Sequence, residues 1–277
     1  MERALTLVAL TSACVPAPAE GDVHRQAIEA RGVVLYTSPD GTAWARVPGT
    51  VHPSLQSLGL SVRPGGDVWV TGLDFHGRAT LWERFVAGPP VRGMVFDGTS
   101  WRDQTWSVDD DDTVNFVDPQ WLGDELWYVA RPGKAGDPAM DGAQNTVRSA
   151  PPAVERLALP RVTDPSPVTF RGALHLFVTV EGRRIEQWTG DPLRSVQSWT
   201  NATVPFATVV GDELWLIAQQ GLRQKRQPVV ARSGDGVSWS DFTPMIPWDS
   251  AESCTSPVMG AHPGGGLLLL CVEEAGP

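Results

Sequence analysis

The sequence predicts an all-β fold, a five-bladed β-propeller that is closed by pairing its own two ends. Three observations predict it: the composition, a glycine-plus-apolar segment that recurs five times, and a polar turn motif that recurs with the same period. The 277 residues include 28 Gly, 24 Pro and 12 Trp. So much Gly and Pro leaves few uninterrupted helical windows, whereas Trp suits half-buried pleated surfaces. With 42% hydrophobic residues, the chain can also bury a large core.

The first repeated element is a glycine followed by an apolar strand. The five copies are GDVWVTG from Gly66, GDELWYVA from Gly123, GALHLFVT from Gly172, GDELWLIA from Gly211 and GGLLLLCV from Gly265. The four steps between the first and the last copy average about fifty residues, which is the length of one four-stranded propeller blade. Five copies therefore predict five blades.

The second repeated element is the turn motif S-x-D-G-x-x-W. Ser38, Asp40, Gly41 and Trp44 form one full copy, Ser233, Asp235, Gly236 and Trp239 form another, and Asp97, Gly98 and Trp101 form a shorter third. An Asp carboxylate accepts backbone N–H bonds in a tight turn, Gly supplies a positive φ, and Trp can pack between blades. The motif therefore predicts a structural turn rather than a catalytic signature.

The phase of the two repeats predicts how the ring closes. Each glycine-strand element precedes a turn element within a repeat, yet the chain begins with a turn and ends with a strand. Strands near 32–37 and 43–47 should therefore pair with strands near 255–260 and 267–273, which removes the unpaired sheet edge of an open array. We expect residues 31–277 to form this single domain, as a monomer.

The turn motif resembles the Asp-box of sialidase-type repeat propellers. The resemblance implies a turn between the third and fourth strands of a blade, on the face away from the ligand. A sialidase would also need an arginine cluster, an acidic general acid and a nucleophilic Tyr paired with Glu. The only tyrosines are Tyr36 and Tyr128, both inside expected strands, so sialidase activity is not expected.

Two other segments are similar to the innermost and second strands of five-bladed glycosidases of the arabinanase and fructosidase type. They are FVDPQWLGDELWYVA and PSPVTFRGALHLFVT, since an Asp-Pro or Ser-Pro opens the inner strand in those enzymes. The resemblance implies a carboxylate pair, one protonated and one ionised. Asp118 is the nearest candidate, with Asp74, Asp112 and Asp164 as companions. Because no pair stands out by motif, glycoside hydrolysis is the alternative function.

The main expectation is a non-enzymatic binding propeller at the cell envelope, with a glycan or a protein as its ligand. Loops near 73–78, 102–112, 131–145, 181–184 and 221–226 should form the ligand face. Five basic residues should gather there as a cationic patch that attracts acidic ligands: Arg183, Arg184, Arg223, Lys225 and Arg226. The net charge of −10 argues against nucleic acid. The histidine spacing and the run Asp109 to Asp112 match no metal motif, so no metal or cofactor is expected.

The N-terminus resembles a bacterial lipoprotein signal. Residues 1–14 hold a short apolar run that ends in TSAC, and residues 15–30 indicate a flexible linker. The run is too short to span a membrane. We therefore expect an exported protein that is attached to the envelope only by lipid on Cys14. The remaining Cys254 and Cys271 should form a disulfide in the closing blade, because an intervening glycine-rich turn brings them opposite each other.

Overall fold

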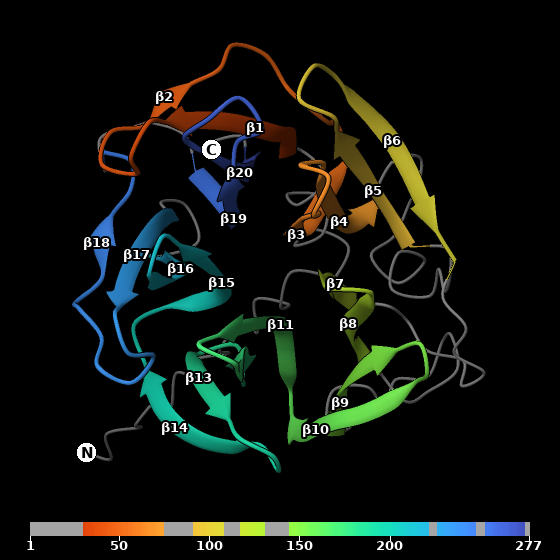
Figure 1. The fold of residues 1–277 in the computed structure, drawn as a ribbon, viewed down its shortest axis with the longest axis vertical. Helices are drawn as coiled ribbons and strands as arrows, with labels where there is room; N and C mark the ends of the chain where they lie inside the picture. Colours follow the sequence, from red (N-terminus) through yellow and green to blue (C-terminus); the bar gives the residue numbers. More distant parts are fainter. Residues whose placement is uncertain are drawn as a thin grey trace, which may run out of the picture.

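The protein is a five-bladed β-propeller, as the repeats predicted. The structure, a computed structural model, describes residues 30–74, 91–107, 117–130, 144–221, 226–247 and 253–274. These residues form twenty strands and no helix, and the strands make five four-stranded antiparallel sheets around a central axis (Figure 1). The predicted signal with Cys14, and the linker up to residue 29, lie outside the described residues.

Each blade takes its four strands in order from the axis outward. Blade I holds β3 (Leu55–Val62), β4 (Val68–Asp74), β5 (Val91–Phe96) and β6 (Trp101–Trp106). Blade II holds β7 (Val117–Leu122), β8 (Glu125–Ala130), β9 (Gln144–Ala150) and β10 (Val154–Pro160). Blade III holds β11 (Val162–Phe170), β12 (Ala173–Val180), β13 (Arg184–Thr189) and β14 (Arg194–Trp199). Blade IV holds β15 (Thr203–Val210), β16 (Glu213–Gln220), β17 (Gln227–Ser233) and β18 (Thr243–Pro244).

The closing blade combines the two ends of the described chain. Its order is β19 (Ser253–Ala261), β20 (Leu267–Glu274), β1 (Ala30–Ser38) and β2 (Ala45–Arg46). β1 and β20 are antiparallel, with Val34 opposite Cys271 and Leu35 opposite Leu270. The largest cluster of buried apolar side chains also joins the closing blade to blades I and IV. The predicted closure is therefore confirmed, in hydrogen bonding and in packing.

The recurring glycine-strand elements are the second strands of the blades. In β12 the residues from 175 to 180 are buried, and in β16 those from 214 to 219, because each strand lies between the inner and third strands of its own sheet and between two neighbouring blades. This position explains why these strands are continuous apolar runs instead of alternating ones. The turn before β12 contains two residues of positive φ, Arg171 at 50° and Gly172 at 78°, as a tight β-hairpin requires.

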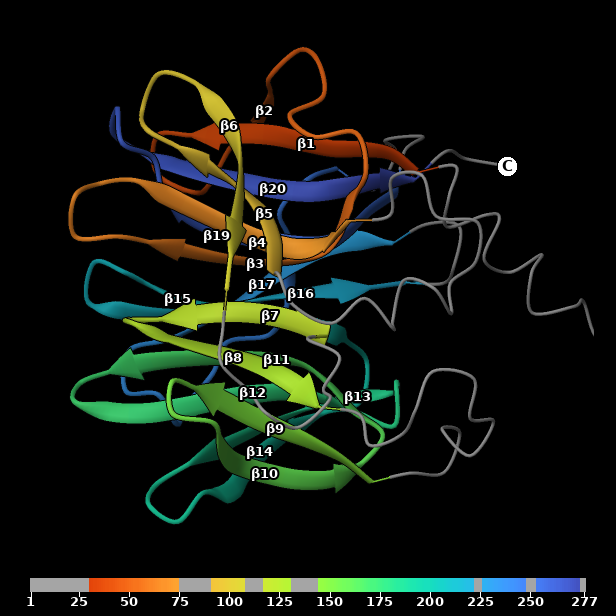
Figure 2. The same cartoon turned by 90° about the vertical axis from the view of Figure 1, so that its right-hand side faces the viewer.

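The even number of strands in a blade gives the propeller two distinct faces. Each blade is an antiparallel meander of four strands, so the chain returns to the same face before it starts the next blade. All five inner strands, β3, β7, β11, β15 and β19, therefore begin at one face, which we call the entry face. The hairpins between first and second strands and the turns between third and fourth strands lie at the opposite turn face. Figure 2 shows the strands running between the two faces.

Within the described residues, no helix is long and apolar enough to cross a membrane.

Candidate functional site

A β-bulge at matching positions of all five inner strands marks the entry face. The register with the second strand shifts between Gln56 and Gly59 in β3, and the other four inner strands shift at the equivalent place. The first bulged residues are Ser57, Asp118, Asp164, Val204 and Ser256. Bulges redirect side chains and terminate pairing, and they concentrate next to functional sites.

Four of the five first bulged residues share an unusual backbone conformation. The φ angle is 50° at Ser57, 52° at Asp164, 52° at Val204 and 48° at Ser256, although none of these residues is glycine. A non-glycine residue in this left-handed region costs about 1–3 kcal/mol and persists only where its surroundings enforce it. Because this cost recurs in four of the five blades, the bulges are a maintained feature of the entry face and not a local irregularity.

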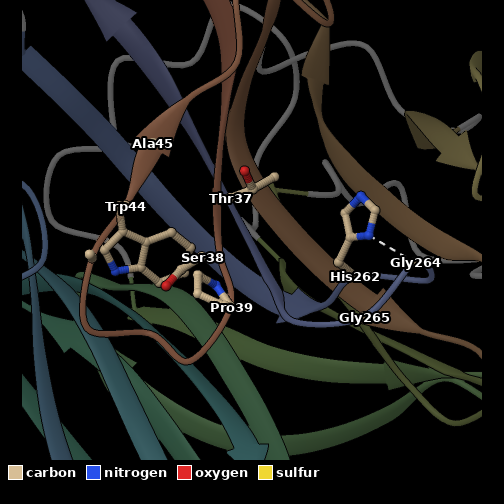
Figure 3. A pocket seen from close by; sticks show the side chains of 9 residues that line it. Thr37, Ser38, Pro39, Trp44, Ala45, His262, Gly264 and Gly265 are labelled. Atoms are coloured by element: carbon tan, nitrogen blue, oxygen red, sulfur yellow. Dashed lines mark hydrogen bonds between the residues drawn. The ribbon is translucent and has the colours of Figure 1, made fainter.

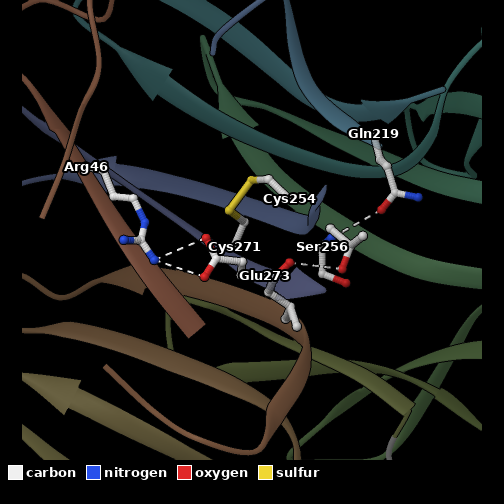
Figure 4. Close-up of a disulfide and its surroundings, with 8 residues drawn as sticks. Arg46, Gln219, Cys254, Ser256, Cys271 and Glu273 are labelled. Carbon is white, nitrogen blue, oxygen red and sulfur yellow. Dashed lines mark hydrogen bonds and ion pairs between the residues drawn. A yellow bond between two sulfur atoms is a disulfide. The ribbon is translucent and has the colours of Figure 1, made fainter. Parts of the chain in front are cut away.

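Hydrogen bonds from the preceding blade hold two of these bulges in place. The backbone N–H of Val204 donates to the hydroxyl of Thr179 at 2.9 Å. In the same way, the N–H of Ser256 donates to Gln219 Oε1 at 3.3 Å (Figure 4). Thr179 and Gln219 occupy equivalent positions in β12 and β16, opposite the residue before their own bulge. These two hydrogen bonds therefore connect blade III to blade IV, and blade IV to the closing blade, at the level of the bulges.

Two of the five bulged residues are aspartates, and they lie in adjacent blades. Asp118 is followed by Pro119 in β7, Asp164 is followed by Pro165 in β11, and these two inner strands pack side by side. Asp164 is half-buried, and its Oδ2 accepts a hydrogen bond from the Thr163 hydroxyl at 2.8 Å. The backbone register therefore brings two of the predicted carboxylate residues to equivalent places around the axis.

The other predicted carboxylates are placed less fully. Asp112 lies outside the described residues. Asp74 is the last residue of β4, a strand that runs toward the entry face.

The predicted cationic patch is only partly described, because Arg223 and Lys225 lie outside the described residues. Arg184 is paired with two carboxylates, since its Nε donates to Glu186 at 2.8 Å and its Nη1 to Glu181 at 2.9 Å. The hydrogen bond with Glu186 is the main reason why the pKa of Arg184 is raised above its ordinary value. Arg183 is exposed in the β12–β13 turn, and Arg226 is half-buried. The patch stays a prediction.

The repeated turn motifs lie between third and fourth strands, on the turn face. In the turn after β17, Ser233 Oγ accepts from Gly236 N at 2.8 Å, and Asp235 Oδ1 accepts from the N–H groups of Val237 and Ser238 at 2.8 and 2.7 Å. These backbone bonds, that of Ser238 first, hold the pKa of Asp235 well below its usual range.

The other two copies of the motif repeat this pattern. Asp97 accepts from the N–H groups of Thr99 and Ser100, and Asp40 accepts from both the N–H and the hydroxyl of Thr42. These bonds likewise lower the pKa of Asp97 and of Asp40. Because these carboxylates are engaged by their own turns, they are not available for acid–base chemistry.

A hollow of about 610 Å³ lies beside the first turn motif, lined by Trp44, Ser38 and His262 among others (Figure 3). The imidazole of His262 accepts a hydrogen bond at Nδ1 from Gly264 N at 2.9 Å. The lining contains no carboxylate, so this hollow lacks the groups for glycosidic bond cleavage. Within the described chain, no group of three or more His, Cys, Asp or Glu side chains could hold a metal ion.

The predicted disulfide between Cys254 and Cys271 is confirmed (Figure 4). It links β19 to β20 in the closing blade, two residues before the bulge at Ser256. Beside it, Arg46 Nη2 contacts both carboxylate oxygens of the buried Glu273, at 2.9 and 3.1 Å. Both features stabilise the blade that joins the two ends of the described chain.

Similar solved structures are five-bladed glycosidases, although the sequence itself matches no family model and no curated protein. One is a thermostable family-43 glycoside hydrolase, 9% identical, with a TM-score of 0.53 over 80% of this chain and 89% of that one. Another is the endo-arabinase from Bacteroides thetaiotaomicron, 12% identical, with a TM-score of 0.53 over 87% and 97%. A third is the xylan β-1,4-xylosidase from Bacillus halodurans, 14% identical, with a TM-score of 0.52 over 78% and 48%.

These similarities overturn the expectation of a non-enzymatic binding propeller. That expectation depended on the absence of a recognisable carboxylate pair. The resemblance to five-bladed glycosidases had aligned Ser166-Pro167 with the opening of the inner strand. The register instead puts Asp164-Pro165 at the bulge, equivalent to Asp118-Pro119. The overlooked signal was an Asp-Pro dipeptide near the start of the inner strand in each of two successive blades, Asp118-Pro119 and Asp164-Pro165.

Proposed function

We propose that the protein is a glycoside hydrolase of the five-bladed propeller type, with Asp118 and Asp164 as its carboxylate pair. The observation that carries the proposal is the placement of these two aspartates at equivalent bulges of adjacent inner strands. Glycosidases cleave the bond between sugars with two carboxyl groups, one that protonates the leaving oxygen and one that is ionised. The two aspartates at the entry-face end of the propeller axis supply the two carboxyl groups that this reaction needs.

A contact of Asp164 suggests how the two roles are divided. The Thr163 hydroxyl donates a hydrogen bond to Asp164, which favours the ionised carboxylate. We therefore assign Asp164 as the ionised group, which activates water or attacks the anomeric carbon, and Asp118 as the acid, which protonates the leaving oxygen. The fold shared with arabinan- and xylan-degrading enzymes makes neutral pentose polysaccharides the first substrates to test.

The repeated turns on the opposite face support the scaffold rather than the chemistry. We propose that S-x-D-G-x-x-W is an Asp-box variant that fixes the connection between third and fourth strands. Its support is the shared set of bonds from turn N–H groups to Asp40, Asp97 and Asp235.

The test compares Asp118→Asn and Asp164→Asn with wild type on aryl arabinosides and xylosides and on linear arabinan and xylan. Each substitution should reduce kcat on the polysaccharides roughly 10²–10⁴-fold, the usual contribution of a positioned acid or base. Asp118→Asn should retain far more activity on aryl glycosides with a good leaving group, because such a group needs no proton. Asp164→Asn should lose activity on both kinds of substrate.

Asp212→Asn is the matched control, because it makes the same chemical change at an exposed residue in the β15–β16 hairpin of the turn face. It should hydrolyse every substrate at the wild-type rate. Full activity in Asp118→Asn and Asp164→Asn, with turnover by wild type, would remove the basis for the assignment. The absence of turnover by wild type on the whole panel would contradict the proposed activity.

A further inference from the structure

A second cleft on the turn face carries polar groups that the proposed hydrolysis does not use. The cleft has a volume of about 630 Å³ and lies between the outermost strand of blade II and the turn-face end of blade III. We call it the β10–β13 cleft, and its lining includes Glu155, Arg156, Leu174, Thr189, Asp191 and Leu193. Small-molecule sites usually have volumes of about 300–1,000 Å³.

The guanidinium of Arg156 is held at this cleft by contacts with three residues. Its Nε donates to the hydroxyl of the buried Ser149 at 2.8 Å, and its Nη2 is 3.1 Å from Glu125 Oε2. The guanidinium also lies over the buried Trp127 ring, 5.3 Å from its centroid. A guanidinium held in this way loses little additional freedom when a ligand binds, so its binding cost is small.

One edge of this guanidinium is available to a ligand. The hydrogen bonds of Arg156 use Nε and Nη2, and Nη1 makes none within the described residues. The Arg156 side chain is 32% exposed. Arg156 lines the cleft, and Nη1 carries two N–H donors that are left for a ligand.

The charge around Arg156 selects against an anionic ligand. Its positive charge is balanced by Glu125, and the exposed Glu155 and Asp191 add two further carboxylates to the lining. An acidic ligand would be repelled. The cleft thus offers the planar guanidinium as a donor and carboxylates as acceptors, with no net positive charge. It also contains the half-buried apolar side chains of Leu174 and Leu193.

We infer that the β10–β13 cleft is a second carbohydrate-binding site, for a neutral saccharide chain. A neutral sugar presents hydroxyl groups that can both donate and accept, and C–H faces that pack on apolar side chains. Arg156 would donate to those hydroxyls, and Glu155 and Asp191 would accept from them. The ligand class is taken from the proposed function, so the inference deepens it. The site would hold the polysaccharide on the face opposite the carboxylate pair.

The experiment measures retardation of the full chain in native gels that contain soluble polysaccharide, with the double variant Asp118→Asn and Asp164→Asn as background to prevent hydrolysis. Neutral arabinan, arabinoxylan and xyloglucan are compared with anionic polygalacturonate at one ionic strength. Arg156→Ala should weaken retardation by a neutral polymer roughly tenfold or more, as expected for loss of a charged hydrogen-bond donor. Arg156→Lys should recover only part of it, because it keeps the charge but not the planar fork.

A second variant keeps the test decisive if Arg156→Ala fails to fold. Glu155→Ala combined with Asp191→Ala removes two exposed acceptors and should also weaken retardation, whereas Asp212→Ala, on another blade of the same face, should not. Equal retardation of all variants, an equal loss in Asp212→Ala, or stronger retardation by polygalacturonate would overturn the inference.

The two proposals fail in different ways in this design. Retardation that depends on the cleft, found without any turnover by wild type, would support the second site and contradict the hydrolase. Turnover by wild type together with cleft variants that bind normally would contradict only the second site.

Discussion

At the scale of single residues, left-handed backbone positions occur at both faces of the propeller. At the entry face they are held by Ser57, Asp164, Val204 and Ser256, which carry side chains despite the conformational cost. At the turn face, glycine takes many such positions, and at some of them a side chain would also collide. A Cβ on Gly236, where φ is 79°, would lie 2.9 Å from His175 Cε1. A Cβ on Gly172, where φ is 78°, would meet nothing within 4 Å.

This difference predicts that Gly236→Ala destabilises the protein more than Gly172→Ala does. Both variants incur the left-handed cost of about 1–2 kcal/mol. Only Gly236→Ala adds overpacking, for which core substitutions typically cost about 1–3 kcal/mol. Urea unfolding of both variants and of wild type measures the difference. Equal losses in the free energy of unfolding would contradict this prediction, because they would show that the His175 side chain moves aside without an energetic cost.

At the scale of structural elements, a buried latch joins blades III and IV. Gln187 Nε2 in β13 contacts His175 Nδ1 in β12 at 2.9 Å and donates to the carbonyl of Gly236 at 2.8 Å. Trp239 Nε1 in turn donates to Gln187 Oε1 at 3.1 Å, and its ring packs edge-on against Trp199. The turn motif of one blade is thus bonded to the interior of the preceding blade. Because Gln187 donates to His175, the latch requires a neutral imidazole that accepts at Nδ1.

The latch predicts a pH dependence of stability. Burial lowers the pKa of His175, so the folded protein takes up a proton on this imidazole at a lower pH than the unfolded chain, which does so below about pH 6.5. Stability should therefore decrease as the pH falls from 7 to 5, because the unfolded state binds more protons, with a slope of at most about 1.4 kcal/mol per pH unit from this group. His175→Gln should reduce this slope in urea unfolding experiments.

Gly172→Ala serves as the control for the latch, since it should lower stability yet keep His175. It should retain the wild-type slope. An unchanged slope in His175→Gln would mean that the acid sensitivity arises elsewhere.

At the scale of the whole molecule, three interactions stabilise the closing blade, which joins the two ends of the described chain. The backbone pairing of β1 with β20 joins strands from the two ends of the described chain, the bond between Cys254 and Cys271 fixes β19 to β20, and Arg46 binds the buried Glu273. The two cysteines are 17 residues apart in sequence. The disulfide therefore restricts only a short loop of the unfolded chain, whereas the strand pairing closes nearly the full length.

Replacing both cysteines by alanine should lower the free energy of unfolding by about 3 kcal/mol, the amount expected for a loop of this size. The fold should be retained, because β1 still pairs with β20. Urea unfolding and far-UV circular dichroism of the double variant, compared with oxidised and with fully reduced wild type, provide the measurement. Reduced wild type and the variant should agree, and stability equal to that of oxidised wild type in the variant would contradict the expectation.

Much of the fold could be predicted from the sequence, but only part of the site. The GDELW segments and the D-G-x-x-W turns are determined by local structure. The distance between their copies in the sequence therefore gave the number of blades, and the order of the two elements predicted how the propeller closes. The sequence placed Asp118 and Asp164 among four candidates but did not single them out as the pair, because bulge positions differ from strand positions by one or two residues. An error of two residues selected Ser166-Pro167 in place of Asp164-Pro165.

The sequence by itself determined the blade number, the joining of the chain ends and the cysteine pair, because turn residues and strand periodicity act over short distances and repeat once per blade. Only the tertiary structure decided which residues meet at the axis and which groups share the β10–β13 cleft. Those contacts join residues from different blades. They depend on the register of each strand and on how neighbouring blades pack, and neither is encoded in any local stretch of residues.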